Sequence, residues 1–132
     1  MRILVTLFML FLATPVFAVT RDAVTSGEKG NTGTTLTVSH TVTASGGNRV
    51  LYVLCGLRSL TITATATYAG QAMTQVAGGT HGSTNLRSYI FRKTAPATGA
   101  NDWVVTQSSA GAMACWALSA TDVNQATPET DT

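Results

Sequence analysis

Hydrophobic and polar residues alternate along much of the chain, with a period of two. In the segment 35–43, Leu36, Val38 and Val42 share one parity, and the other parity holds only Thr and Ser. The segment 60–68 repeats the pattern with four threonines on the opposite parity. Strict alternation is typical of a β-strand with one buried face and one face in water. Both segments are therefore predicted to be strands.

A second group of segments predicts strands without that alternation. Residues 50–55 are apolar on both parities, which is typical of a central strand covered on both faces. Residues 110–120 also allow a helix, because Ala and Leu are common there. The remaining strand candidates are 72–76, 87–92, 104–106 and 112–118.

Glycine, proline and asparagine separate these segments. The breaks fall at 45–48, at 68–70 (a tight hairpin), in a polar loop at 78–85 and at 95–101. Short strands repeated about every eight to twelve residues, with turn residues between them, indicate a sandwich or barrel. The predicted fold is therefore all-β: an antiparallel β-sandwich, jelly-roll or immunoglobulin-like.

Residues 1–18 have the order of a secretory signal peptide. The positively charged start Met1-Arg2 is followed by an apolar run at 3–12 and a small-residue cleavage site that ends at Ala18. A membrane-spanning helix needs about 20 apolar residues, and this run is shorter. We predict a signal-peptide helix that is removed, which leaves no stable membrane anchor. The product is expected to be extracellular or at the cell surface, with the periplasm as the alternative.

The expected domain organisation follows from these segments. Residues 1–18 are the signal peptide, 19–33 a flexible N-terminal segment, 34–128 the β-sandwich domain and 129–132 a C-terminal tail.

Composition narrows the classes of partner. The chain has 132 residues, of which 11% are charged, and a net charge of +2. This length allows one domain. So few charges exclude a coiled coil and an acidic disordered tail, and the near-neutral balance provides no basic surface for nucleic acid. We expect no nucleic-acid partner.

The chain has two cysteines, Cys55 and Cys115, and both lie in predicted strands. A disulfide between them is physically allowed in an oxidising compartment. Two buried free cysteines acting as small hydrophobic residues are the alternative, and the sequence leaves both open. The only histidines, His40 and His81, have no ligand-like spacing to either sulfur, so we expect no metal site and no cofactor.

Few residues in the sequence are candidates for a catalytic role. A serine nucleophile would need His81 beside a serine and a carboxylate such as Asp102 or Asp122, yet the chain has no Gly-x-Ser-x-Gly motif. His40 shares the parity of the buried residues in its strand and is expected to be structural. There is no phosphate-binding or dinucleotide-binding glycine pattern. We predict no catalytic residues.

The sequence offers more candidates for ligand binding than for catalysis. Trp103 follows a polar loop directly, and an exposed aromatic ring there would offer a platform for a sugar. The candidate ligand-binding set is Trp103, Tyr89, His81 and Asn85. It requires Trp103 or Tyr89 to be exposed beside the polar loops, although the alternation in 87–92 favours an inward Tyr89. Trp116 lies in the apolar segment 114–118 and is expected in the core instead.

Four motifs occur in a recognisable order along the chain. They are Asn-Arg-Val-Leu at 48–51, Tyr-Ala-Gly-Gln-Ala-Met-Thr at 68–74, Pro-Ala-Thr-Gly at 96–99 and Val-Asn-Gln-Ala-Thr-Pro at 123–128. As an ordered set they resemble an uncharacterised group of secreted bacterial and phage-associated β-sandwich modules. The resemblance implies a sandwich in surface or extracellular proteins, with no established catalytic residues to carry over. Asp122 stands where the group has Gly and Asn124 where it has Asp, which bears on the local turn.

The resemblance also bears on completeness. In those modules further strands follow the Gln-x-x-Pro segment, so it implies that the sandwich here is incomplete and truncated at its C-terminus. An incomplete sandwich has an open groove that an extended segment can fill. The segment 19–33 would be the donor in a filament assembled by donor-strand addition, and a fragment of a longer protein is the simpler alternative.

The expected function is a secreted, non-enzymatic β-sandwich module with a structural or adhesive extracellular role. The alternatives are a carbohydrate-binding domain and a filament subunit, and a hydrolase is the least favoured. The expected partners are surface glycans or neighbouring subunits.

Overall fold

A computed structural model describes residues 19–59, 61–81 and 85–128. The expected signal peptide and C-terminal tail lie outside these ranges. The described residues form nine strands and no helix, and none of them belongs to a helix that could cross a membrane.

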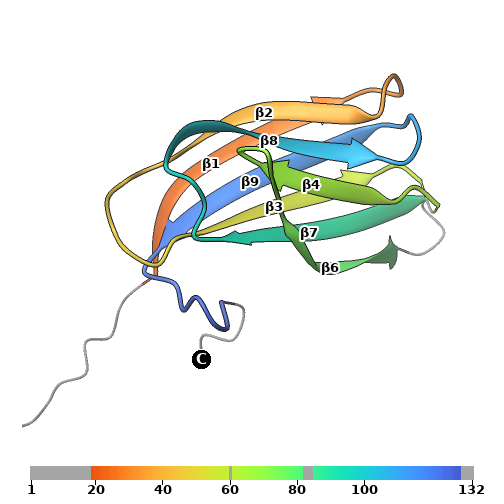
Figure 1. The fold of residues 1–132 in the computed structure, drawn as a ribbon. Coiled ribbons are helices and arrows are strands. Elements are labelled where there is room, and N and C mark those ends of the chain that lie inside the picture. The colour runs from red at the N-terminus through yellow and green to blue at the C-terminus, as the bar shows by residue number, and fades with distance from the viewer. Residues whose placement is uncertain (1–18, 60, 82–84, 129–132) are drawn as a thin grey trace, which may run out of the picture.

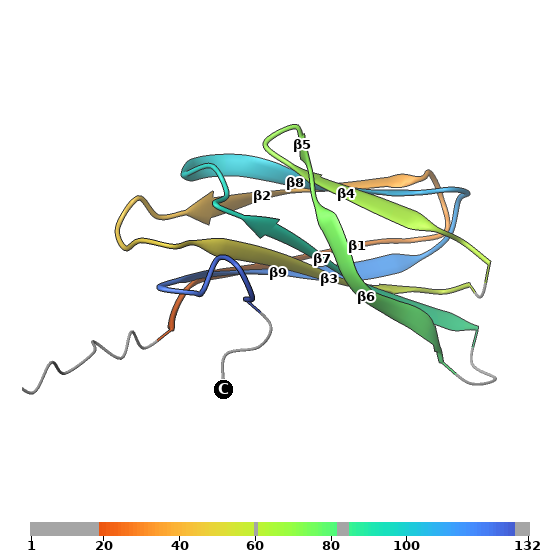
Figure 2. The same cartoon turned by 60° about the horizontal axis from the view of Figure 1, so that its bottom comes forward.

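The strands form two antiparallel sheets packed face to face (Figures 1 and 2). The larger sheet, sheet A, has the order β1-β9-β3-β7-β6, with bounds β1 Thr20–Lys29, β9 Met113–Thr121, β3 Val50–Leu57, β7 Leu86–Thr94 and β6 Thr74–His81. The smaller sheet, sheet B, has the order β2-β8-β4-β5, with bounds β2 Thr35–Val42, β8 Gly99–Gln107, β4 Ala64–Tyr68 and β5 Gln71–Ala72. The predicted all-β sandwich is confirmed, and the helix allowed at 110–120 is excluded by β9.

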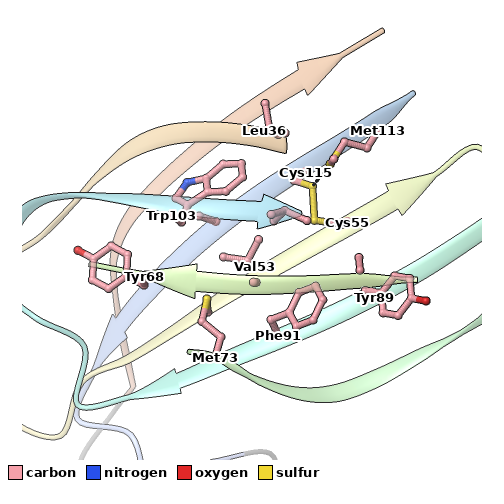
Figure 3. Packing of buried hydrophobic residues seen from close by; sticks show 14 of the residues in the cluster. Leu36, Val53, Cys55, Tyr68, Met73, Tyr89, Phe91, Trp103, Met113 and Cys115 are labelled. Carbon is pink, nitrogen blue, oxygen red and sulfur yellow. Dashed lines mark hydrogen bonds between the residues drawn. A yellow bond between two sulfur atoms is a disulfide. The ribbon is translucent and has the colours of Figure 1, made fainter. Parts of the chain in front are cut away.

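The inward side chains of both sheets form the core, and Figure 3 shows part of it, aromatic and aliphatic side chains together with the disulfide. In β2, Leu36 and Val42 are buried while Thr37 and Thr41 are exposed, as the alternation predicted. The outer face of sheet B is thus rich in hydroxyl groups. Trp103 on β8 is among the largest fully buried side chains.

A disulfide joins the two sheet strands β3 and β9. Cys55 and Cys115 are direct partners in the antiparallel register, with their Cα atoms 4.2 Å apart. The bond lies on the inner face of sheet A, between the packed sheets (Figure 3).

The expectation of a flexible segment at 19–33, outside a sandwich that begins at 34, is wrong. Residues 20–29 form β1, which pairs along β9 at the edge of sheet A. A Cβ atom at Gly27 would collide with the side chain of Val38 on β2, so the glycine lets the two edge strands approach closely. The proposed donor strand therefore already fills a sheet edge of its own chain.

Two local expectations change and a third is confirmed. Residues 78–81, expected in a loop, belong to β6, and the strand expected from residue 60 begins at Ala64. The tight hairpin expected at 68–70 is confirmed. Ala69 and Gly70 both have positive φ, 49° and 73°, as a two-residue turn between twisted strands requires.

The apolar strand β3 is central in its sheet, as predicted, but it is not covered on both faces. Its inner side chains are buried, whereas Leu54 on the outer face is 39% exposed. The second apolar parity of this strand therefore reaches an open surface.

Candidate functional site

The outer face of sheet A carries an aromatic side chain at its centre. Trp116 on β9 is 53% exposed and lies opposite Leu54 in the register with β3. On the next strands of the same row lie Ser26 of β1 and Ile90 of β7. This row forms a mostly apolar ridge across the sheet.

The next outward-facing row, two residues further along the strands, has very small residues at its centre. Ala114 of β9 pairs with Gly56 of β3, and the row ends at Glu28 on β1. A Cβ atom at Gly56 would meet only the end of Leu86, at 3.8 Å, so this position is open space above the sheet. The two small residues thus make a floor below the level of Trp116.

Arg58 and Leu86 border the floor on the side away from Trp116. Arg58 follows β3 and continues its outward parity, and its backbone N–H donates to the carbonyl of Ala112. Leu86 of β7, 40% exposed, lies beside it. We call this surface the trough: it runs along the strands from Trp116 and Leu54, over the floor of Ala114 and Gly56, to Arg58 and Leu86, with Glu28 on its β1 side.

The trough consists of hollows that share residues. A hollow of about 280 Å³ lies between Trp116 and Glu28, and one of about 540 Å³ extends from Glu28 to Arg58 and Leu86. Both are lined by Ala114. A third, of about 690 Å³, continues from Arg58 to Asn31 and Asn85 among the loops at this end of the sandwich.

Charged groups of both signs line the trough. Glu28 and Arg58 are exposed, and no described residue makes a hydrogen bond or ion pair with the Arg58 guanidinium. The Lys29 ammonium donates to the carbonyls of Gly30, Gly33 and Gly111, at 3.3, 2.8 and 2.8 Å. It therefore ties two loops together beside the middle hollow and adds a second positive charge there.

The two aromatic residues of the predicted ligand-binding set, Trp103 and Tyr89, do not lie in the trough. Trp103 is fully buried, and its indole N–H donates to Thr25 Oγ1 at 3.1 Å. Tyr89 is 3% exposed, donates to the carbonyl of Ile62 and stacks on Phe91 with ring centroids 5.7 Å apart. Both belong to the core, so the candidate site's condition, an exposed ring at Trp103 or Tyr89, is not met.

The other two predicted site residues fall at the loop end. Asn85 is exposed and lines the third hollow, so it lies at one end of the trough. The side chain of His81 lies outside the described part of the structure.

Trp116 was expected in the core, and this too is wrong. Its neighbours in sequence are apolar, which concealed the alternation of β9. Met113, Cys115 and Ala117 are buried, so the even-numbered positions between them face outward. The signal available in the sequence was parity with Cys115: if the cysteine points inward, the adjacent Trp116 points outward.

A second polar cluster connects the two sheets. The Ser119 hydroxyl donates to Asp22 Oδ2 at 2.9 Å, which leaves Ser119 Oγ to accept from His40 Nε2 at 3.0 Å. Thr25 Oγ1 lies 3.0 Å from His40 Nδ1 and accepts from Trp103, so its own hydroxyl donates to the ring. In this series of hydrogen bonds, which runs from Trp103 through Thr25, His40 and Ser119 to Asp22, every donor has an acceptor.

This cluster contains a serine, a histidine and an aspartate but not in a catalytic order. In a hydrolytic triad the histidine lies between the serine and the acid. Here Ser119 lies between His40 and Asp22, and Ser119 and His40 are 0% and 1% exposed. A substrate has no access to the hydroxyl, and the cluster acts as a clasp between β1, β2, β8 and β9.

The electrostatics of the clasp agree with a structural role. Burial lowers the pKa of His40, partly opposed by the charge of Asp22, so the ring is neutral and can accept from Thr25. For Asp22, burial alone would raise the pKa, but hydrogen bonds from Thr43 and Ser119 outweigh it and lower the pKa. The carboxylate stays ionised and accepts both bonds. Among the described residues no three His, Cys, Asp or Glu side chains gather as a metal site.

Comparisons with protein-family models, with curated proteins and with solved structures gave no match. The resemblance drawn from the sequence motifs therefore stays a prediction.

Proposed function

We propose that this chain is a non-enzymatic adhesive module that binds carbohydrate through the trough on the outer face of sheet A. The observation that carries the proposal is Trp116, a large aromatic ring 53% exposed above a floor of small residues. A ring face buries the apolar side of a sugar, and neighbouring polar groups then bond its hydroxyls.

The polar groups needed for such recognition lie beside the ring. Ser26 and Glu28 line the same hollow as Trp116 and offer a hydroxyl and a carboxylate. The hollow is shallow and open, which suits a ligand displayed on a surface.

Export supports an adhesive role outside the cell. The expected signal peptide and the Cys55–Cys115 disulfide are both typical of proteins that mature in an oxidising compartment. Secretion is part of the proposal, and mass spectrometry of the exported product would show whether the chain begins at Val19.

A non-enzymatic role is favoured by the polar chemistry of the described residues. Of the serine, histidine and aspartate that do come together, Ser119 and His40 are buried away from any substrate. The filament alternative loses its donor, because residues 20–29 already pair with β9.

The test is binding of the processed protein to immobilised neutral and acidic glycans, compared with Trp116→Ala. We expect the substitution to weaken binding about tenfold or more, equivalent to about 1.4 kcal/mol of lost stacking and burial. Val24→Ala is the matched control, because Val24 is also 53% exposed on the same face but outside the trough.

Three outcomes would contradict the proposal. The wild-type protein fails to bind any glycan in the panel, or Val24→Ala weakens binding as much as Trp116→Ala does, or Trp116→Ala leaves affinity unchanged. Circular dichroism of each variant checks that the sandwich is intact.

A further inference from the structure

The trough is long enough for more than one sugar ring. From Trp116 in β9 to Ala112 just before it, the trough follows four residue steps, about 13 Å at the usual extended rise of 3.3 to 3.4 Å per residue. The three hollows succeed one another along this direction, because the first two share Ala114 and the last two share Arg58. A short oligosaccharide matches this shape better than a single ring does.

The charges change along the trough. Among the described residues that line the hollow beside Trp116, Glu28 alone is charged. The middle hollow adds Lys29 and Arg58 to Glu28, and Arg58 is the one charged residue in the described lining of the third hollow. The trough is therefore negative at the Trp116 end and positive at the loop end.

The positive end is built for an anion. A guanidinium presents a planar fork of donors that matches a carboxylate, and this one is not neutralised by a described residue. The amides of Asn31 and Asn85 line the same hollow and can supply further donors.

From this arrangement we propose that the trough selects an acidic oligosaccharide, with one sugar ring on Trp116 and the carboxylate of a second sugar at Arg58. This inference rests on the proposed function, since it specifies the ligand of the same site. Glu28 lines the hollow beside Trp116 and disfavours a carboxylate there, so the charges also set the direction in which the oligosaccharide binds.

The test compares a disaccharide of one neutral sugar and one uronic acid, such as cellobiouronic acid, with its methyl ester, which keeps both sugar rings and removes the charge. We expect the wild-type protein to bind the acid at least tenfold more tightly than the ester by calorimetry at low salt. Arg58→Gln should abolish this preference, so that the acid and the ester bind with equal affinity. Arg58→Lys should retain only part of it, because the ammonium keeps the charge and loses the fork.

Arg21→Gln is the matched control. It removes the same charge from an exposed position of β1 outside the trough, so the preference should persist. Gly56→Leu is a second variant that fills the floor from the outside, where the added side chain faces open space. It should weaken binding of the acid and of the ester alike.

The outcomes separate the two proposals. Equal affinity for acid and ester, with both lost in Trp116→Ala, would overturn the acidic ligand and leave carbohydrate binding in place. An equal loss of preference in Arg21→Gln and Arg58→Gln would show that overall charge, not the trough, causes it, and would also overturn the inference. Binding of a peptide library with no glycan bound would overturn both.

Discussion

At the scale of single residues, the type of a side chain does not decide its role in this protein. Trp103 is enclosed with its N–H bonded to Thr25, whereas Trp116 is half exposed on the outer face of sheet A. His40 and Ser119, which could in principle do chemistry, are buried and serve to hold the sheets together. Burial and hydrogen-bond partners, rather than residue type, decide which side chains are available to a ligand.

The clasp gives a stability prediction for Ser119. Ser119→Ala removes the acceptor of His40 Nε2 and the donor to Asp22, and leaves buried polar atoms without partners. An unsatisfied buried group costs about 1 to 3 kcal/mol, and we expect a loss of that size in the free energy of urea unfolding. Ser39→Ala on β2 is the control, because Ser39 is exposed and its removal should change little. Equal stability of the two variants would refute the clasp.

The clasp also gives a pH prediction for His40. Its folded pKa is lowered, so below the ordinary value of about 6.5 the unfolded chain binds more protons than the folded one. The stability due to the neutral ring is complete above that value. It is lost as the pH falls from about 6.5 towards the lower folded pKa. An NMR titration of the folded protein should give a His40 midpoint below 6.5, and a midpoint at or above it would contradict the prediction.

At the scale of elements, the pairing of β1 and β9 and the disulfide between β3 and β9 consolidate one half of sheet A. β9 is the strand that both devices share, and it also carries Trp116 and Ala114. The trough is thus supported by strands whose register is held by a covalent bond. A binding surface on a fixed sheet loses little conformational entropy when it is occupied.

The disulfide gives a prediction at this scale. Replacing Cys55 and Cys115 together by Ala should lower the unfolding free energy, because the bridge closes a loop with a sequence separation of 60 residues. The chain-entropy model gives about 4 kcal/mol for such a loop, and measured values are commonly 2 to 4 kcal/mol. Urea unfolding of the oxidised wild type and of the double variant checks this. A difference below about 0.5 kcal/mol would show that strand pairing alone holds the register.

At the scale of the whole molecule, the two outer faces of the sandwich differ in chemistry. The face of sheet B presents Thr37, Thr41 and Thr65 to solvent, while the face of sheet A presents Trp116 and Leu54. The buried aromatic residues lie between them (Figure 3). Only the second face combines an aromatic ring, opposite charges and a hollowed floor, which is why the proposed binding site is assigned there.

Much of this architecture could be predicted from the order of residues. Alternation in 35–43 predicted both faces of β2 correctly, and the Ala-Gly pair at 69–70 predicted its hairpin, because these features depend on local backbone geometry. His40 was expected on the buried parity of β2 with its ring hydrogen-bonded, and it is 1% exposed with both ring nitrogens in hydrogen bonds. Asn85 was named as a candidate from its polar loop and does line the end of the trough.

What the sequence by itself determined is the element type: strands where side chains alternate, turns where glycine and asparagine interrupt them. What only the tertiary structure decided is which apolar side chains end up covered. Trp103 and Trp116 are equally hydrophobic, but Trp103 faces sheet A across the core and Trp116 faces away from sheet B. The place of β1 beside β9 was decided in the same way, since a strand's edge partner comes from a segment distant along the chain. The physical reason is that alternation is a property of neighbouring residues, whereas burial depends on the sheet that packs against them.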